Sequence, residues 1–550
     1  MIKKIRFKYI LLIILSFSLG FITQDKDKYY QIAKSIDVFG RIFKQVNNNY
    51  VDNIDVEQFM LAGIKGMLSS LDPYTVYLNK NLQNDFNLLT SGKYGGIGVT
   101  VGLQNGKVTI IDLLEGYPAQ RQGIRIGDVI VKIDTQEISS KNYNDLSNYL
   151  KKVPGTEINL TVEREGFSNP IIFNLRTEII EIKNVTYFGF VPDSSNNAYI
   201  KLSGFSRSAG EEVNSAIREL QSRKEIKSIV LDLRGNPGGL LNSAIEVCEK
   251  FLPKGKLIVS VKGKNSVATS KMFAKENPVA ENLPLAILIN GGSASASEIV
   301  TGAIQDHDRG IVVGTESFGK GLVQTVVPLS NSASLKITTG KYYTPSGRSI
   351  QRIDYSHNNK VFIDHDNLKR AVFKTDNNRK VYSAGGIKPD SVIYSNDDSQ
   401  IMMTLLARGI FFKFATNYYN SHPETDYITL AADTIFTAFN KYLNNKKFIY
   451  NNKLDNIYAQ LEKEINNYSP SDSLRMNLSN LNLELQNMKD RILLKHKSDI
   501  ISEIRQEFAA RMFGRKGRIK ESLKNDLQFD TAIKILNNQK LYNKILKIIE

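Results

Sequence analysis

The spacing of apolar residues divides the first third of the chain into a helical stretch and a strand-rich stretch. Residues 28–90 repeat apolar side chains three or four positions apart, as at Ile36 and Phe39, which predicts amphipathic helices. From Tyr94 to Thr177 the pattern changes to short β-rich runs broken by glycines. One helix is expected there, around Tyr143–Leu150. This stretch predicts a small β-domain.

Strands and helices alternate after Ala198. The apolar runs Ser228–Leu233, Leu285–Asn290 and Gly310–Gly314 are typical of buried strands, and helical patterns separate them. These helices are expected at Ala209–Arg223, Leu240–Phe251 and Ala296–Gln305. Such alternation predicts parallel βαβ units, which bind ligands beyond the carboxyl ends of their strands. From about Ser399 to the end the pattern is helical.

The N-terminus resembles an export segment. A basic stretch at residues 1–8 precedes an apolar run from Tyr9 to Ile22, and charged residues follow. Fourteen helical residues span about 21 Å, less than the ~30 Å hydrocarbon core of a bilayer. We therefore expect a signal peptide or signal anchor within residues 1–24, in preference to a buried helix. Whether it is removed stays open.

Composition and charge restrict the chemistry. The length of 550 residues suggests about three or four domains. The net charge of +16 is compatible with a nucleic-acid partner, a membrane surface or a lysine-rich background. The lone Cys248 excludes intrachain disulfides and cysteine-based zinc sites, and the histidines are scattered. We therefore expect no metal and no cofactor, and catalysis through oxygen or nitrogen groups.

Two predicted strands end in turns that suit catalysis. The stretch 231–240 leads from a strand into a Gly-Gly turn, which can present backbone N–H groups to an oxyanion but can also be a plain connection. The second turn carries Ser295. Ser295-x-x-Glu298 fits a helix capping box, so Ser295 can be a mere cap. Its tight Gly-Gly entry and small neighbours instead favour an exposed hydroxyl, with the N–H of Ala296 facing the same space.

A serine nucleophile needs a base. His307 lies at the far end of the helix that Ser295 begins, about 18 Å away, and is expected to be a C-terminal cap. Lys320 follows the next strand and should return to the same end of the sheet as Ser295. It can act as a base if apolar neighbours lower its pKa, and Gln324 could hold its amine without adding charge.

The stretch around Lys320 also resembles a phosphate-binding P-loop. Gly314 and Gly319-Lys320 have the P-loop spacing. However, Gly321 stands where that motif needs Ser or Thr, and the β-branched stretch 322–329 follows where it needs a helix. The sequence thus disfavours nucleotide binding.

Several motifs together resemble the carboxyl-terminal processing proteases, also called tail-specific proteases. In that family a serine is followed 25 positions later by lysine and four further on by glutamine, and Ser295, Lys320 and Gln324 match this pattern. The resemblance covers about residues 30–395. The other matching stretches are LDPYTVYL, YGGIGVTV, GYPAQRQGIRIGDVIVKID, LDLRGNPGGLL, YYTPSGRSIQ and AGGIKPD.

The resemblance implies a serine endopeptidase that cleaves near protein C-termini. Ser295 would attack the scissile carbonyl, neutral Lys320 would take and pass on its proton, and Gln324 would orient Lys320. The oxyanion hole would combine the N–H of Ala296 with that of Gly238 or the next glycine.

The β-domain would be a PDZ domain that binds the C-terminal carboxylate of a substrate. Its predicted binding residues are Gly96, Ile97 and Gly98, with the substrate tail added to the sheet edge as a strand. The alternative to the endopeptidase function is a non-catalytic PDZ adaptor with a protease-like fold.

The resemblance also sets the expected fold, and the N-terminal segment sets the expected location. The fold class is an α/β protease core with a crotonase-like sheet, an inserted PDZ β-domain, an N-terminal helical arm and a C-terminal α-helical domain. Expected boundaries are 1–24, 25–90, 91–177, 178–396 with a surface insertion at 354–381, and 397–550.

We expect a periplasmic or membrane-anchored envelope protein, whose run 9–22 can associate with the membrane. Its partners would be protein substrates and an envelope adaptor protein. No nucleic acid is expected, because aromatic residues do not interleave with the basic residues of the tail, residues 489–550.

Overall fold

A computed structural model describes most of residues 28–550. The gaps lie at residues 265–269, 331–332, 354, 356–369, 395–398, 423, 428, 447, 449, 451–452, 469 and 549–550. The predicted export segment 1–24, with its apolar run 9–22, therefore lies outside the described residues, as does most of the predicted insertion 354–381. The described end of that insertion forms a short hairpin of β19 (Val372–Lys374) and β20 (Lys380–Tyr382).

The chain divides into two compact units, residues 1–77 and 78–550. In the first, a helix over residues 28–49 precedes α2 (Val56–Ser69). Asp55 caps α2, since its carboxylate accepts the N–H of Gln58 at 3.1 Å. The rings of Phe43 and Phe59 stack with centroids 5.4 Å apart, which joins the two helices. The helical pattern predicted for this stretch is confirmed.

The β-domain at the start of the second unit is an antiparallel sheet. Its main strands follow the order β3-β4-β5-β7-β8, which confirms the β-domain predicted for this stretch. Their bounds are β3 (Val99–Gln104), β4 (Lys107–Leu113), β5 (Val129–Ile133), β7 (Glu157–Glu163) and β8 (Ile171–Arg176). The helix expected at 143–150 is α-helical only as α5 (Leu146–Leu150), because a 3-10 turn occupies Ser140–Asp145. β2 (Lys93–Gly96) pairs with β9 (Glu178–Glu181) where the chain enters and leaves the domain.

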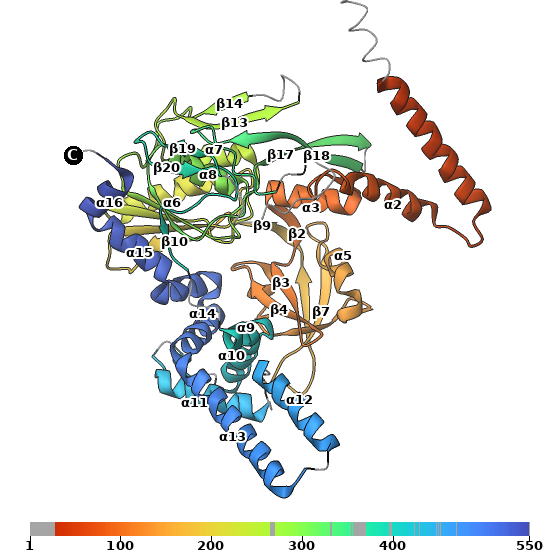
Figure 1. Ribbon diagram of the computed structural model, residues 1–550, viewed down its shortest axis with the longest axis vertical. Helices are drawn as coiled ribbons and strands as arrows, with labels where there is room; N and C mark the ends of the chain where they lie inside the picture. Colours follow the sequence, from red (N-terminus) through yellow and green to blue (C-terminus); the bar gives the residue numbers. More distant parts are fainter. Residues whose placement is uncertain are drawn as a thin grey trace, which may run out of the picture. The chain divides into compact units, whose positions relative to one another are not determined.

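A six-stranded sheet lies between α6 (Ala209–Arg223) and α15 (Leu527–Leu536) in the second unit (Figure 1). Its order is β10-β11-β12-β15-β16-β21, and all pairs are parallel except β10 with β11. The bounds are β10 (Val185–Phe190), β11 (Asn197–Leu202), β12 (Ser228–Asp232), β15 (Leu285–Ile289), β16 (Ile311–Gly314) and β21 (Ser391–Val392). The predicted parallel βαβ arrangement is confirmed. The carboxyl ends of β12 and β15 are adjacent, because Asp232 pairs with Leu288.

Helices cover both faces of this sheet. One face packs against α6 (Ala209–Arg223), α7 (Leu241–Cys248) and α8 (Ala296–Asp306). The other face packs against α15 (Leu527–Leu536) and α16 (Gln539–Leu546), from the very end of the chain. Consecutive strand residues such as Val230 and Leu231 belong to opposite cores. Burial on both faces explains why the strands are uninterrupted apolar runs.

A long hairpin extends from the sheet. β17 (Leu322–Ser330) pairs with β18 (Ala333–Tyr343), which also pairs with β13 (Leu257–Gly263), and β13 in turn pairs with β14 (Ser270–Phe273). The strand β17 follows β16 through the loop 315–321, which contains Lys320. The sequence analysis predicts this loop at the same end of the sheet as Ser295.

The helices between residues 400 and 522 form a domain with its own aromatic core around Phe414, Phe439 and Phe508. They are α9 (Gln400–Ala407), α10 (Ile410–Ser421), α11 (Ala432–Asn445), α12 (Lys453–Asn467), α13 (Asp472–Lys495) and α14 (Lys497–Ser522). A kink at Phe513 and Gly514 divides α14. Residues before the kink pack in the aromatic core, whereas Ile519 packs against the sheet. None of the described helices combines the length and apolarity needed to cross a membrane.

Candidate active site

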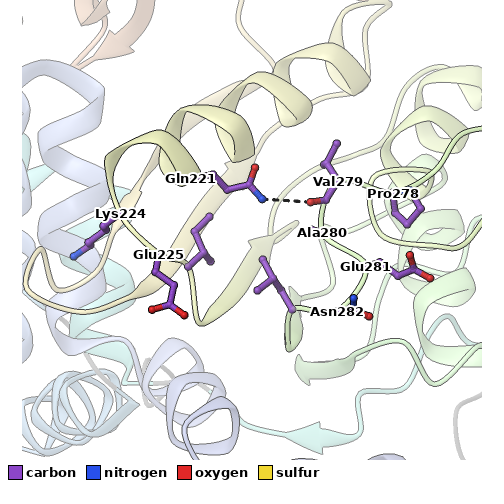
Figure 2. A pocket seen from close by; sticks show the side chains of 10 residues that line it. Gln221, Lys224, Glu225, Pro278, Val279, Ala280, Glu281 and Asn282 are labelled. Carbon is purple, nitrogen blue, oxygen red and sulfur yellow. Dashed lines mark hydrogen bonds between the residues drawn. The ribbon is translucent and has the colours of Figure 1, made fainter.

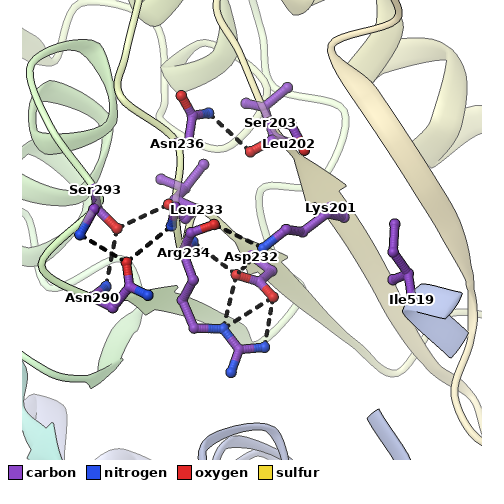
Figure 3. Close-up of polar contacts among 12 residues, drawn as sticks. Lys201, Leu202, Ser203, Asp232, Leu233, Arg234, Asn236, Asn290, Ser293 and Ile519 are labelled. Atoms are coloured by element: carbon purple, nitrogen blue, oxygen red, sulfur yellow. Dashed lines mark hydrogen bonds and ion pairs between the residues drawn. The ribbon is translucent and has the colours of Figure 1, made fainter. Parts of the chain in front are cut away.

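The turns that follow β12 and β15 are joined by hydrogen bonds. The main-chain oxygen of Asn236 accepts the N–H of Ala294 at 3.0 Å and the hydroxyl of Ser297 at 2.9 Å. The side-chain oxygen of Asn290 accepts the N–H of Gly235 at 2.9 Å. Figure 3 shows the bond from the Asn236 carboxamide to the carbonyl of Leu202. The role of Asn236 and Asn290 in joining the two turns was not predicted, since an Asn in a glycine-rich stretch indicates only a turn.

Ser295 has an unusual backbone conformation at the start of α8. Its φ is +54° and its ψ is −111°, a strained combination for a residue with a side chain. A serine that only caps a helix normally has extended backbone angles. The strained angles instead resemble those of a nucleophile elbow, where a sharp turn presents the hydroxyl. The predicted capping box between Ser295 and Glu298 is present as well, so the cap and the elbow-like backbone angles occur together.

A buried carboxylate ties the Ser295 turn to the Lys320 loop. Glu298 is fully buried, and its Oε2 accepts the N–H of Ser295 at 2.8 Å and the N–H of Lys320 at 2.9 Å. Its Oε1 accepts the N–H of Gly319 at 2.7 Å and the hydroxyl of Ser317 at 2.5 Å. The backbones of the two predicted catalytic residues therefore converge on one oxygen atom.

Burial raises the pKa of Glu298 to about 7, although its four hydrogen-bond donors act in the opposite direction. The capping box Ser295-x-x-Glu298 predicted the local bond from Glu298 to the N–H of Ser295. It carried no sign of the three donors from residues 317–320, which are distant in sequence. The role of Glu298 as a bridge was therefore missed.

Lys320 lies at the end of the sheet where Ser295 lies, as predicted. The loop that carries it is held further by the N–H of Phe318, which donates to the carbonyl of Ser293 at 2.9 Å. Both Ser295 and Lys320 are partly buried. Gln324 lies on β17, and its carboxamide donates to the hydroxyl of Thr338 on β18 at 3.4 Å.

His307 ends α8, which confirms the expected cap. Its Nε2 lies 2.7 Å from the carbonyl oxygen of Leu257, and its Nδ1 lies 2.9 Å from the carboxylate of Asp376. Both ring nitrogens therefore have structural partners at the end of α8 opposite Ser295.

Gly238 is the glycine that contacts the Ser295 turn. A Cβ atom at this position would lie 2.7 Å from the oxygen of Ala294 and 2.9 Å from the nitrogen of Ala296. A Cβ at Gly239 would instead collide with the main chain of Phe205. Only glycine permits this approach, because Gly238 also has a φ of +99°. The N–H of Gly238 donates to the side chain of Asn236 at 2.9 Å.

The predicted carboxylate-binding residues connect β2 to β3 in the β-domain. Ile97 is buried in the core of that domain, and its carbonyl accepts the N–H of Ala119 at 3.0 Å. The carbonyl of Gly98 accepts the N–H of Leu114 at 2.9 Å. Among the described strands, β3 pairs with β4 alone, so β3 lies at an edge of its sheet.

Neither a metal cluster among the described residues nor the surface hollow beside α6 coincides with this site. In the described part of the chain no group of His, Cys, Asp and Glu could hold a metal ion. A hollow of about 450 Å³ lies between the end of α6 and residues 278–283, with Gln221 bonded across it to the carbonyl of Val279 (Figure 2). It opens where β12 and β15 begin, at the opposite end of the sheet from Ser295.

Family models match four stretches of the chain. Peptidase family S41 matches residues 196–358, and a PDZ domain matches residues 95–171. The C-terminal helical domain of a probable PDZ-protease matches residues 401–536, and the N-terminal domain of the activating protease CtpB matches residues 18–82.

Two curated proteins show the extent of the similarity. A carboxy-terminal-processing protease of Bartonella bacilliformis is 39% identical over 332 residues, which are 60% of this chain and 74% of that protein. The carboxy-terminal processing protease CtpB of Bacillus subtilis is 31% identical over 58% of this chain and 66% of that protein. A solved photosystem II D1 C-terminal processing protease is 24% identical over 66% of this chain and 93% of that chain, with a TM-score of 0.35.

Proposed function

Because the chain belongs to peptidase family S41 of carboxy-terminal processing proteases, we propose that Ser295 and Lys320 form a catalytic dyad that cleaves proteins near their C-termini. Membership makes the protein a serine-type peptidase. The observation that carries the proposal for these two residues is the Glu298 carboxylate, whose Oε2 accepts both of their backbone N–H groups.

In the proposed reaction, the hydroxyl of Ser295 attacks the scissile carbonyl while the neutral amine of Lys320 takes the hydroxyl proton. Lys320 then passes this proton to the leaving amine, which breaks the peptide bond and leaves an acyl-enzyme. Water, deprotonated by Lys320, hydrolyses the ester. The strained backbone of Ser295 supports this role, because the serine of a nucleophile elbow lies on a similarly strained turn between a strand and a helix.

The oxyanion would bind the N–H groups of Ala296 and Gly238. The close approach of Gly238 to Ala296 supports this choice over Gly239. The N–H of Gly238 would have to exchange its bond to Asn236 for a bond to the oxyanion. Gln324 would similarly turn from Thr338 to orient Lys320.

The PDZ domain would supply the preference for C-termini. The backbone N–H groups at Gly96, Ile97 and Gly98 would bind the terminal carboxylate, and the tail would add as a strand to the edge of β3. The edge position of β3 supports this mode of binding. The basic start and the apolar run 9–22 support a location in the cell envelope, with membrane association through that run. An envelope adaptor protein would bind the C-terminal helical segment.

A non-catalytic adaptor is disfavoured, because Ser295, Lys320 and Gln324 are all present. Nucleotide binding is disfavoured as well, since the loop with Lys320 leads into the strand β17 and not into a helix.

The test compares hydrolysis of an unstructured protein with an apolar C-terminus by the full chain and by variants. Ser295→Ala and Lys320→Arg should each lower kcat by at least about a thousandfold, because arginine stays protonated and cannot act as a base. Lys341→Arg, an exposed lysine on β18, is the matched control and should keep the wild-type rate. Equal rates for the wild type and Ser295→Ala would overturn the proposal.

A further inference from the structure

Arg234 connects the proposed oxyanion turn to the end of the chain. It follows β12, and its guanidinium bonds the carboxylate of Asp232 at 3.0 Å through Nε and at 2.6 Å through Nη2 (Figure 3). Its Nη1 lies 2.7 Å from Asp526 and 3.1 Å from the side-chain oxygen of Gln528, at the start of α15. Only 16% of the Arg234 side chain is exposed, so these bonds are shielded from water.

The charges around Arg234 balance only when Asp526 is counted. Lys201 also bonds Asp232, at 3.0 Å, and the Asp232 side chain is only 1% exposed. Two cations thus share one carboxylate on the sheet, which leaves one positive charge. Asp526, itself 15% exposed, supplies the second negative charge. An uncompensated buried charge is strongly unfavourable, so the cluster depends on the C-terminal helix.

The same neighbouring charges determine the pKa values of Asp232 and Arg234. Burial alone would raise the pKa of Asp232, but the adjacent Arg234 and Lys201 hold it well below its usual range. For Arg234, burial opposes the charged form, and Asp232 together with Asp526 raises its pKa. Both groups are therefore charged throughout the physiological range.

The start of α15 is anchored above this cluster. Asp526 caps α15, since its carboxylate accepts the N–H groups of Gln528 and Phe529 at 3.0 Å each. The side chain of Gln528 donates to the carbonyl of Ile393 at 2.8 Å. The ring of Phe529 meets the ring of Tyr199 edge-on with centroids 5.6 Å apart. The hydroxyl of Tyr199 donates to Asp232 at 2.6 Å, so Phe529 is linked through Tyr199 to the carboxylate that Arg234 also bonds.

The main chain of Arg234 is part of the same cluster. Its N–H donates to Asp232 at 2.8 Å, and its carbonyl accepts the ammonium of Lys201 at 2.8 Å. The next residue, Gly235, donates to Asn290, and the turn then reaches Gly238 beside Ser295. A displacement of Arg234 would therefore move Gly238 relative to the nucleophile.

We propose that Asp526 is a positioning residue for the hydrolysis: by neutralising Arg234 it holds the turn 235–239 in register with Ser295. This inference rests on the proposed function, because it assigns the turn to the oxyanion. It also makes the C-terminal helices beyond the kink in α14 a part of the active site's support.

Asp526→Asn tests the charge alone, because asparagine caps a helix about as well as aspartate. In the full chain, kcat for the unstructured substrate should fall about tenfold or more while KM changes less than about twofold, since a misplaced oxyanion donor weakens the transition state. Asp526→Glu should restore part of kcat. The matched control is Asp530→Asn, an exposed carboxylate on the same helix, which should keep the wild-type kcat.

A second measurement does not depend on activity. In the Ser295→Ala background, the backbone amides of Gly235, Asn236, Gly238 and Gly239 should exchange hydrogen faster with Asp526→Asn than with Asp530→Asn. Equal kcat for the two variants, or a loss explained entirely by the unfolded fraction, would overturn the role of Asp526. Equal exchange rates at the turn would overturn it as well. An inactive wild type with faster exchange in Asp526→Asn would overturn the proposed function and leave the support of the turn intact.

Discussion

At the scale of single residues, the Glu298 carboxylate is the most consequential group. It accepts four hydrogen bonds in a site without solvent access, and its pKa of about 7 allows it to change charge near neutral pH. Its ionised form accepts the N–H groups of both Ser295 and Lys320. Its protonation state therefore affects how firmly the two residues are held together.

The raised pKa of Glu298 predicts a pH dependence of stability. The folded-state pKa of about 7 exceeds the ordinary value of 4.5, so the folded protein binds the proton more tightly than the unfolded chain. The resulting stability is complete below pH 4.5 and is lost as pH rises through 7. The loss is at most about 3.5 kcal/mol, since each pH unit of difference is worth about 1.4 kcal/mol.

Denaturant unfolding of the wild type and of Glu298→Gln, measured from pH 5 to pH 8, checks this prediction. The unfolding free energy of the wild type should fall relative to that of Glu298→Gln as pH rises, because the variant has no titrating group there. Parallel pH curves for the two proteins would contradict it.

The sequence indicated part of this residue-level picture. A capping box is a local pattern, and its bond from Glu298 to the N–H of Ser295 is present. The choice of Gly238 over Gly239 was not predictable, because it depends on which glycine meets the turn after β15. The Asn236 contacts depend on the same packing of two adjacent strand ends.

At the scale of elements, α15 shows how one helix serves two environments. Phe529 is 4% exposed and packs against the sheet, whereas Leu527 is 47% exposed two positions earlier. Phe529→Ala should lower the unfolding free energy by about 3–5 kcal/mol, because it leaves a cavity beside Tyr199. Leu527→Ala should change it by no more than about 0.5 kcal/mol.

Equilibrium unfolding of both variants in urea measures these effects. A loss at Leu527 as large as that at Phe529 would show that α15 does not pack as described. An unchanged stability for Phe529→Ala would show that the C-terminal helices are dispensable for the sheet.

The spacing of apolar residues predicted the helices and strands well where tertiary packing favours the same local structure. The predicted helix at Ala209–Arg223 has the observed bounds of α6, and the strands between the helices are parallel as predicted. The division of the basic tail between two cores was not predicted. Helical periodicity continues through Gly514, and only the left-handed backbone there, with a φ of +62°, separates the two parts of α14.

At the scale of the whole molecule, Cys248 reports on opening of the core. The thiol is fully buried on α7, and burial raises its pKa, so the reactive thiolate is scarce in the native state. We expect a thiol reagent to modify the native protein only as fast as the core opens, and the denatured protein at once. The time course of reagent absorbance with and without denaturant measures both rates.

Ser222→Cys supplies the control, because this position is exposed on α6 of the same domain. The added thiol should react in the native protein at the rate of an accessible cysteine. Rapid native modification of Cys248 itself would contradict the closed core.

The sequence by itself determined the alternation of strands and helices, the family motifs, and the return of Ser295 and Lys320 to one end of the sheet. These features follow from local periodicity and from the rule that parallel strands share a carboxyl edge. Only the tertiary structure decided that Glu298 bridges the two residues, that Gly238 meets Ser295, and that Asp526 neutralises Arg234. Burial and charge balance depend on residues far apart in the chain, and no local pattern contains that information.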